Sequence, residues 1–84
     1  MSAKERQMQI VQGFIDRSRL GMQIEQVQQV GDETPNSHIF TLSCSCGDFV
    51  AIGFDQDKTD SEWVFGTEKK LMDHKALKHA AAHA

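Results

Sequence analysis

The chain has 84 residues, of which 39% are hydrophobic and 25% are charged, and its formal net charge is −3. This composition excludes a disordered chain, and the lack of an apolar run of about 18 residues excludes a membrane-spanning helix. The length predicts one domain over residues 1–84, and the charged start of the chain lacks a secretory signal, so we expect a cytoplasmic protein.

The first third of the chain predicts a helix followed by a strand. Met8, Val11 and Ile15 recur at helical spacing and favour a helix over residues 3–19, with Gly21 as its stop. Residues 22–30 alternate more as a strand does, and residues 31–37 have the composition of a loop. We treat residues 1–37 as an N-terminal extension.

The remainder, residues 38–84, predicts a strand hairpin followed by a helix. Residues 38–43 and 49–54 have strand composition, and the link Cys44-Ser45-Cys46-Gly47 between them predicts an antiparallel hairpin with both thiols at its tip. Residues 55–62 read as an acidic loop, and Thr67 is the expected N-cap of a helix from residue 68 to about residue 82. The predicted fold class is α+β, with an antiparallel sheet of about three strands.

Two side chains outside these motifs are expected to have no role in a site. Trp63, between the acidic loop and the last helix, is expected in the core, although a binding anchor is an alternative. His38, at the start of a predicted strand, is expected at the surface.

Two thiols and two imidazoles at short spacing point to a metal. Cys44 and Cys46 at the hairpin tip and His74 and His79 on the last helix form the ligand set that a structural zinc ion takes. The separation of the histidines requires some loosening of the helix near its end. His83 is an alternative to His79, and a redox role for the thiols is a less favoured alternative.

The second half of this pattern resembles the Cys2His2 zinc-finger family. Phe65-x5-Leu71-x2-His74-x4-His79 matches the family in order and spacing. The first half departs, because one residue separates the cysteines where the family usually has about two to four, and 18 residues lie between Cys46 and Phe65. The resemblance implies a ββα-like core in which Phe65 and Leu71 pack beneath a structural Zn²⁺.

Four protein ligands leave zinc no open position, so we expect no enzyme. The favoured function is binding of a partner protein, as an adaptor, regulator or inhibitor, because the overall acidity argues against general nucleic-acid binding. The alternative is a DNA-binding regulator that uses the basic last helix. The family resemblance then implies base contacts from Thr67, Lys70 and Asp73 and phosphate contacts from three further lysines. Those lysines are Lys69, Lys75 and Lys78.

Overall fold

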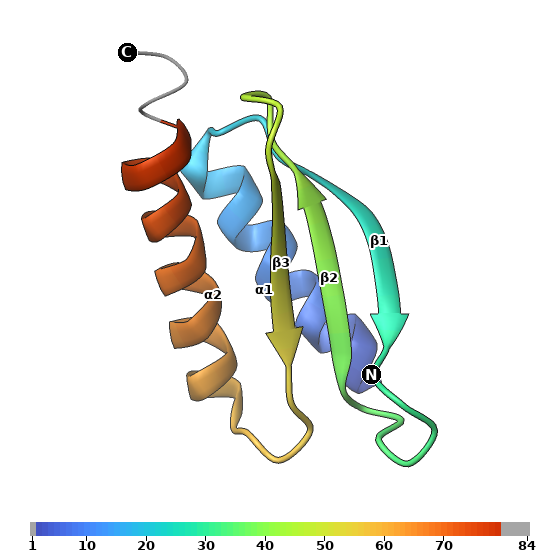
Figure 1. Ribbon diagram of the computed structural model, residues 1–84. Coiled ribbons are helices and arrows are strands. Elements are labelled where there is room, and N and C mark those ends of the chain that lie inside the picture. The colour runs from blue at the N-terminus through green and yellow to red at the C-terminus, as the bar shows by residue number, and fades with distance from the viewer. Residues whose placement is uncertain (1, 80–84) are drawn as a thin grey trace.

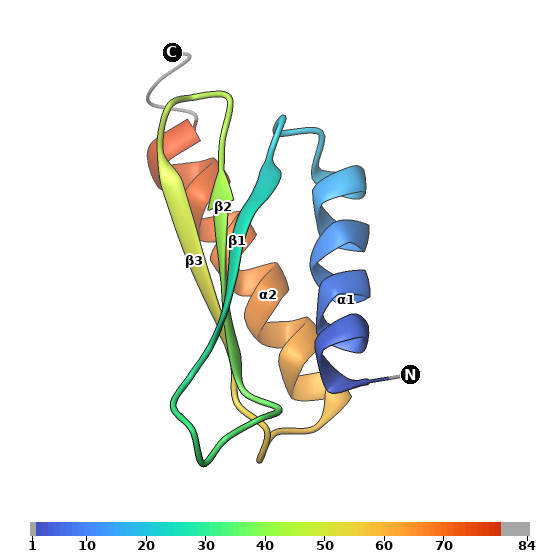
Figure 2. The same cartoon turned by 90° about the vertical axis from the view of Figure 1, so that its right-hand side faces the viewer.

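The computed structural model describes residues 2–79, in which two helices cover one face of a three-stranded antiparallel sheet (Figures 1 and 2). The sheet has the order β1-β2-β3. This architecture confirms the predicted α+β class. The elements in chain order are α1 (Ala3–Ser18), β1 (Gln23–Gln29), β2 (His38–Ser43), β3 (Phe49–Phe54), α2 (Asp60–His74) and a π-helical turn, η1 (Lys75–His79).

Helix α1 begins at a capped N-terminus and ends at a left-handed residue. The Ser2 side chain accepts a hydrogen bond from the Glu5 amide, which satisfies one of the unpaired donors of the first turn. Arg19 has φ of 55°, so the helix ends at Ser18, slightly before the predicted stop at Gly21. Val11 and Ile15 are buried as expected, whereas Met8 remains 37% exposed.

Among the described residues, the hairpin of β2 and β3 supplies half of the buried apolar core. Its register is unbroken from His38 opposite Phe54 to Ser43 opposite Phe49, so alternate side chains face the helices. Strand β1 pairs with the other side of β2 and contains one irregularity between Ile24 and Gln26. The buried apolar residues come from the N-terminal extension, the hairpin and α2, in one cluster: Val11, Ile15, Leu20, Met22, Phe40, Leu42, Cys44, Val50, Ile52, Phe54, Trp63 and Leu71.

Helix α2 starts earlier than the sequence predicted. The expectation that residues 55–62 form a loop and that Thr67 caps the helix is wrong. Thr59 is the N-cap, because its side chain accepts from the Glu62 amide while the Glu62 carboxylate accepts from the Thr59 amide. The helix therefore begins at Asp60 and contains the last part of the predicted loop.

This shift changes which side chains of α2 enter the core. Trp63, Thr67 and Leu71 lie on the buried stripe, and the Thr67 hydroxyl donates to the Trp63 carbonyl oxygen at 2.8 Å. Phe65, predicted to pack beneath the metal, is 70% exposed because it lies on the opposite side of the helix. The core expectation is confirmed for Trp63 and Leu71 and wrong for Phe65.

His38 is also placed differently from the expectation. It is only 6% exposed, because its position on β2 points it towards α1. Its Nδ1 lies 2.9 Å from Oε1 of Gln7, a polar residue of α1 that is itself fully buried. The predicted surface position of His38 is wrong. Its burial is tolerated because a polar side chain on the facing helix forms a hydrogen bond with its ring.

Candidate metal centre

The two cysteines lie on a three-residue hairpin turn between β2 and β3. The Gly47 amide donates to the Cys44 carbonyl oxygen at 2.9 Å, and the Cys44 amide donates to the Asp48 carbonyl oxygen at 2.9 Å. Gly47 has φ of 94°, which a side chain would disfavour. These bonds are those of a type I turn closed by a left-handed glycine, a common hairpin connection. The tight bend predicted from Cys44-Ser45-Cys46-Gly47 is therefore present.

The connection between α1 and β1 packs against this turn. The Leu20 carbonyl oxygen accepts from the Ser45 hydroxyl at 2.8 Å and from the Cys44 thiol at 3.5 Å. A Cβ on Gly21 would lie 3.0 Å from the Ser45 side chain, and Gly21 has φ of 71°. The turn that carries the thiols is thus held by a segment distant in sequence, a contact that the sequence did not reveal.

His74, the last residue of α2, completes a cluster with the two cysteines. Its Nε2 lies 3.5 Å from the Cys46 Sγ, and the ligand atoms of Cys44, Cys46 and His74 lie within 4.8 Å of one another. Tetrahedral zinc with bonds of about 2.3 Å to sulfur and 2.0 Å to nitrogen separates those two ligand atoms by about 3.5 Å. The structure therefore brings three of the four predicted ligands into an arrangement that could hold a metal ion.

The environment of this cluster disfavours a bare thiolate at Cys46. Neither cysteine forms a disulfide. A hydrogen bond from the Asp48 backbone lowers the pKa of the Cys46 thiol, but burial and the neighbouring Cys44 and Asp48 side chains raise it more in total. A divalent cation would reverse that balance, because it supplies the positive charge that a coordinating thiolate needs.

The fourth predicted ligand, His79, is the last residue of the π-helical turn η1. Its backbone is described, but its side chain lies outside the described part of the chain, as does the whole of the alternative, His83. In an α-helix, with about 3.6 residues per turn, residues five apart face different directions. A π-helix closes its hydrogen bonds between residues five apart and brings such positions nearer to one face. The π-helical turn η1 therefore provides the loosened helix geometry that the spacing of His74 and His79 requires.

The segment from β2 to α2 is a small ββα-like unit with the cysteines at the hairpin tip and His74 at the end of the helix (Figure 1). Comparisons with protein-family models, curated proteins and solved structures give no match to this chain. The finger resemblance thus extends to the arrangement of this unit, without a family match. No helix of residues 2–79 has the length and apolar character needed to cross a membrane.

The predicted nucleic-acid contacts do not form one uniform basic surface. Thr67, the first expected base-reading position, is fully buried. Lys69 forms an ion pair with Asp73 at 3.3 Å, while Lys70 and Lys75 are exposed. The side chain of Lys78 lies outside the described part of the chain.

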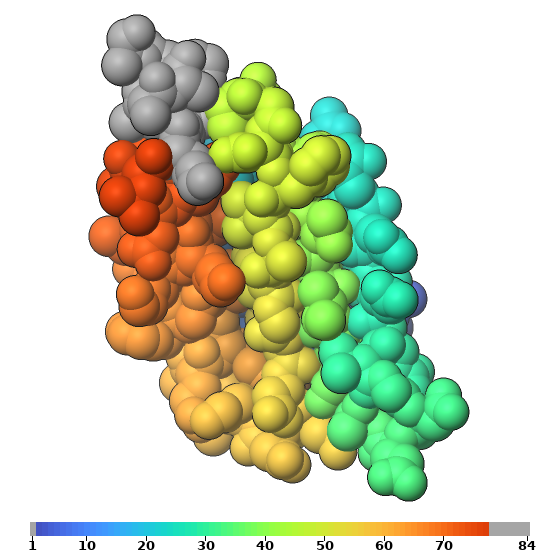
Figure 3. Space-filling model, viewed as in Figure 1, coloured from blue at the N-terminus to red at the C-terminus, as the bar shows by residue number. Residues whose placement is uncertain are grey.

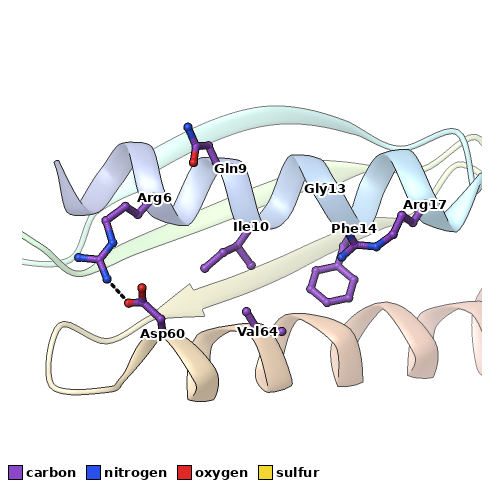
Figure 4. Close-up of a pocket in the computed structure, with 8 residues that line it drawn as sticks. All are labelled: Arg6, Gln9, Ile10, Gly13, Phe14, Arg17, Asp60 and Val64. Carbon is purple, nitrogen blue, oxygen red and sulfur yellow. Dashed lines mark hydrogen bonds and ion pairs between the residues drawn. The ribbon is translucent and has the colours of Figure 1, made fainter. Parts of the chain in front are cut away.

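A groove between α1 and α2, on the side away from the sheet, is a second feature that the sequence analysis missed (Figure 4). Phe14 and Val64 line both of its adjoining hollows, and Arg6 pairs with Asp60 at one end. The Arg17 guanidinium lies 4.6 Å from the centre of the Phe14 ring. The signal was Ile10 and Phe14, four residues apart beside the main apolar stripe of α1.

Proposed function

We propose that this chain is a small, non-catalytic zinc-binding module that acts by binding a partner protein as an adaptor, regulator or inhibitor. The observation that carries the proposal is the convergence of two thiols and one imidazole within 4.8 Å. Cys44 and His74 are buried at 6% and 5% exposure, which suits a structural ion better than one that receives a substrate.

His79 is the proposed fourth ligand. The support is the π-helical turn from Lys75 to His79, which follows His74 directly. Irregular turns of this kind are rare in helices and concentrate at functional sites. With four protein ligands the ion has no position for water, so its role is to hold the hairpin tip against the end of α2.

The metal assignment is tested by native mass spectrometry of protein purified without chelator. We expect one zinc ion per chain, and its loss from Cys46→Ser. His79→Ala should weaken zinc binding by more than the roughly 10- to 100-fold that loss of an outer-shell partner costs, whereas His83→Ala, the matched control, should not. Wild-type protein without zinc would overturn the proposal, and loss through His83→Ala alone would move the fourth ligand to His83.

The partner-binding part of the proposal rests on the groove between α1 and α2. Its lining includes the apolar side chains of Ile10, Phe14 and Met72 as well as charges of both signs. Val64 and Met72 remain 38% and 61% exposed there. An apolar groove between parallel ridges, rimmed by polar groups, fits an amphipathic helix of another protein.

Two variants matched in exposure test this surface. Val64, in the groove, is 38% exposed, and Met8, on α1 outside the groove lining, is 37% exposed. We expect Val64→Glu to remove a specific partner captured from cells of the source organism, while Met8→Glu retains it. Equal retention by both variants at unchanged melting temperature would show that the groove is not the docking site.

Nucleic-acid binding is the alternative, favoured only by the exposed Lys70 and Lys75 near the end of α2. Backbone attraction is strongest at low salt, so a gel shift with random duplex is the sensitive test. Retardation at micromolar protein that Lys70→Gln abolishes would favour this alternative over the partner-binding proposal.

A further inference from the structure

The outer edge of β3 differs from that of β1 in carrying no charge, no proline and no register irregularity. Strand β1 carries an irregularity beside Glu25, whose carboxylate accepts from the Ser43 hydroxyl. Strand β3 has an unbroken register and the sequence Phe-Val-Ala-Ile-Gly-Phe, with neither a charge nor a proline. Proteins usually blunt exposed edge strands with such devices, because an unprotected edge is a template for another strand.

The register identifies which backbone groups face outward from this edge. The Cys44 amide bonds to Asp48, so the pairs alternate from there between bonded and non-bonded. The amide and carbonyl groups of Phe49, Ala51 and Gly53 consequently point away from β2. Among the described residues, no hydrogen bond from a loop or side chain reaches these groups. Their side chains lie on the exposed face, where Phe49 is 69% exposed.

The position of α2 limits which kinds of chain can pair with the outer edge of β3. Figures 1 and 2 show α2 lying to the side of β3 and behind the plane of the sheet. A second copy pairing through β3 would bring its own α2 into the space beneath the sheet, which the core already fills. A single extended segment carries no such helix, so it can add to the edge above α2.

A hollow beside the edge would receive the side chains of such a segment. It lies between β3 and α2. Gly53, Trp63, Phe65 and Gly66 form its apolar part, and four polar side chains complete the lining: Asp55, Lys58, Ser61 and Glu62. Figure 3 shows this face, with α2 running alongside β3. A Cβ at Gly53 or Gly66 would meet nothing within 4 Å, so both glycines leave space. Phe65, which the sequence predicted beneath the metal, lines this hollow and would offer an apolar contact to such a segment.

We propose that the β3 edge binds an extended segment of a partner protein by strand addition, with apolar side chains at alternate positions directed into the hollow between β3 and α2. Backbone bonds to Phe49, Ala51 and Gly53 provide affinity, and the hollow selects the side chains. This surface is separate from the α1–α2 groove and specifies a second mode of partner binding within the proposed function.

The test uses a displayed library of random peptides selected on the full, zinc-loaded chain. We expect enrichment of peptides with alternating apolar residues and slowed amide exchange at Phe49, Ala51 and Gly53 when they bind. Ala51→Pro removes one outward amide without removing a bond to β2 and should weaken binding at least tenfold. A proline on β1, such as Gln28→Pro, is not an equivalent control for Ala51→Pro, because β1 has a different register. The control for the edge is therefore a pair of lysine substitutions, one on each edge strand.

That pair is Ala51→Lys on β3 and Gln28→Lys on β1, both at exposed positions and equal in charge. Ala51→Lys should weaken binding of the selected peptides, and Gln28→Lys should not. This comparison tests the edge even if Ala51→Pro fails to fold. Val64→Glu should leave peptide binding unchanged, so failure of the groove proposal and of the edge proposal are distinguishable. Enriched peptides without alternation, or equal binding to Ala51→Lys and Gln28→Lys, would overturn the strand-addition proposal.

Discussion

At the residue scale, two hydrogen bonds of the buried Gln7 side chain link α1 to the start of β2. Gln7 donates from Nε2 to the Asn36 carbonyl oxygen at 2.8 Å, which leaves its Oε1 as the acceptor for His38 Nδ1–H. This assignment requires a proton on Nδ1 of His38, which the neutral Nδ1–H tautomer and the imidazolium both carry. Burial lowers the pKa of His38, and the nearby Lys4 lowers it further.

The charge state of His38 should therefore make stability depend on pH. The unfolded chain has the ordinary histidine pKa of about 6.5, above the folded value, so it binds more protons in the window between them. The contribution is fully present above about pH 6.5 and is lost as pH falls through the folded pKa. In urea titrations at constant zinc, we expect the unfolding free energy of His38→Gln to fall less than that of wild type below this pH. Parallel curves would contradict this.

At the scale of elements, the start of α2 determines which side chains form the site. The capping box of Thr59 and Glu62 sets the helix start, and the Lys58–Glu62 ion pair at 3.6 Å lies beside it. The cap lowers the pKa of Glu62, chiefly through its hydrogen bond with the Thr59 backbone. From this start the buried stripe reaches His74 at the end of α2, next to Cys46.

Removing this cap should destabilise the whole chain, since α2 carries both core and site residues. Thr59→Ala should cost about 1 kcal/mol in unfolding free energy, as expected for loss of an N-cap side chain. The matched control is Ser61→Ala, an exposed hydroxyl in the same first turn. Urea unfolding would measure both, and a cost for Ser61→Ala as large as that for Thr59→Ala would contradict the capping role.

At the scale of the whole molecule, the candidate metal centre lies where distant segments meet. The turn between β2 and β3, the end of α2 and the Leu20 carbonyl all converge at one end of the fold. The Arg6–Asp60 ion pair links α1 and α2 near the opposite end. A chain of 84 residues buries a modest core, so an ion at one end would add to a stability that is otherwise limited.

Removal of zinc should therefore loosen one end of the molecule before the other. We expect a chelator to lower the melting temperature and to speed amide exchange at Cys44–Gly47 and near His74, because metal binding free energy adds to folding free energy in such sites. Exchange around Thr59 should change less. Unchanged melting of the metal-free protein would show that no ion stabilises the fold.

The sequence by itself determined features that depend on neighbours along the chain. Strand alternation and the Cys44-Ser45-Cys46-Gly47 turn predicted the hairpin and the place of both thiols, because β-branched residues and a positive-φ glycine act locally. The pairing of His74 with the cysteines as metal ligands came from the types of side chain and from the resemblance to zinc fingers, not from a local pattern.

The start of α2 has a local signature, the capping box Thr59-x-x-Glu62, which the choice of Thr67 as the cap overlooked. Only the tertiary structure decided the burial of His38 and the exposure of Phe65. His38 is buried because Gln7, far away in sequence, lies opposite it with a matching acceptor. Packing and polar pairing between distant segments have no signature in local spacing, which is why the sequence predicted most elements and a candidate metal cluster but not these placements.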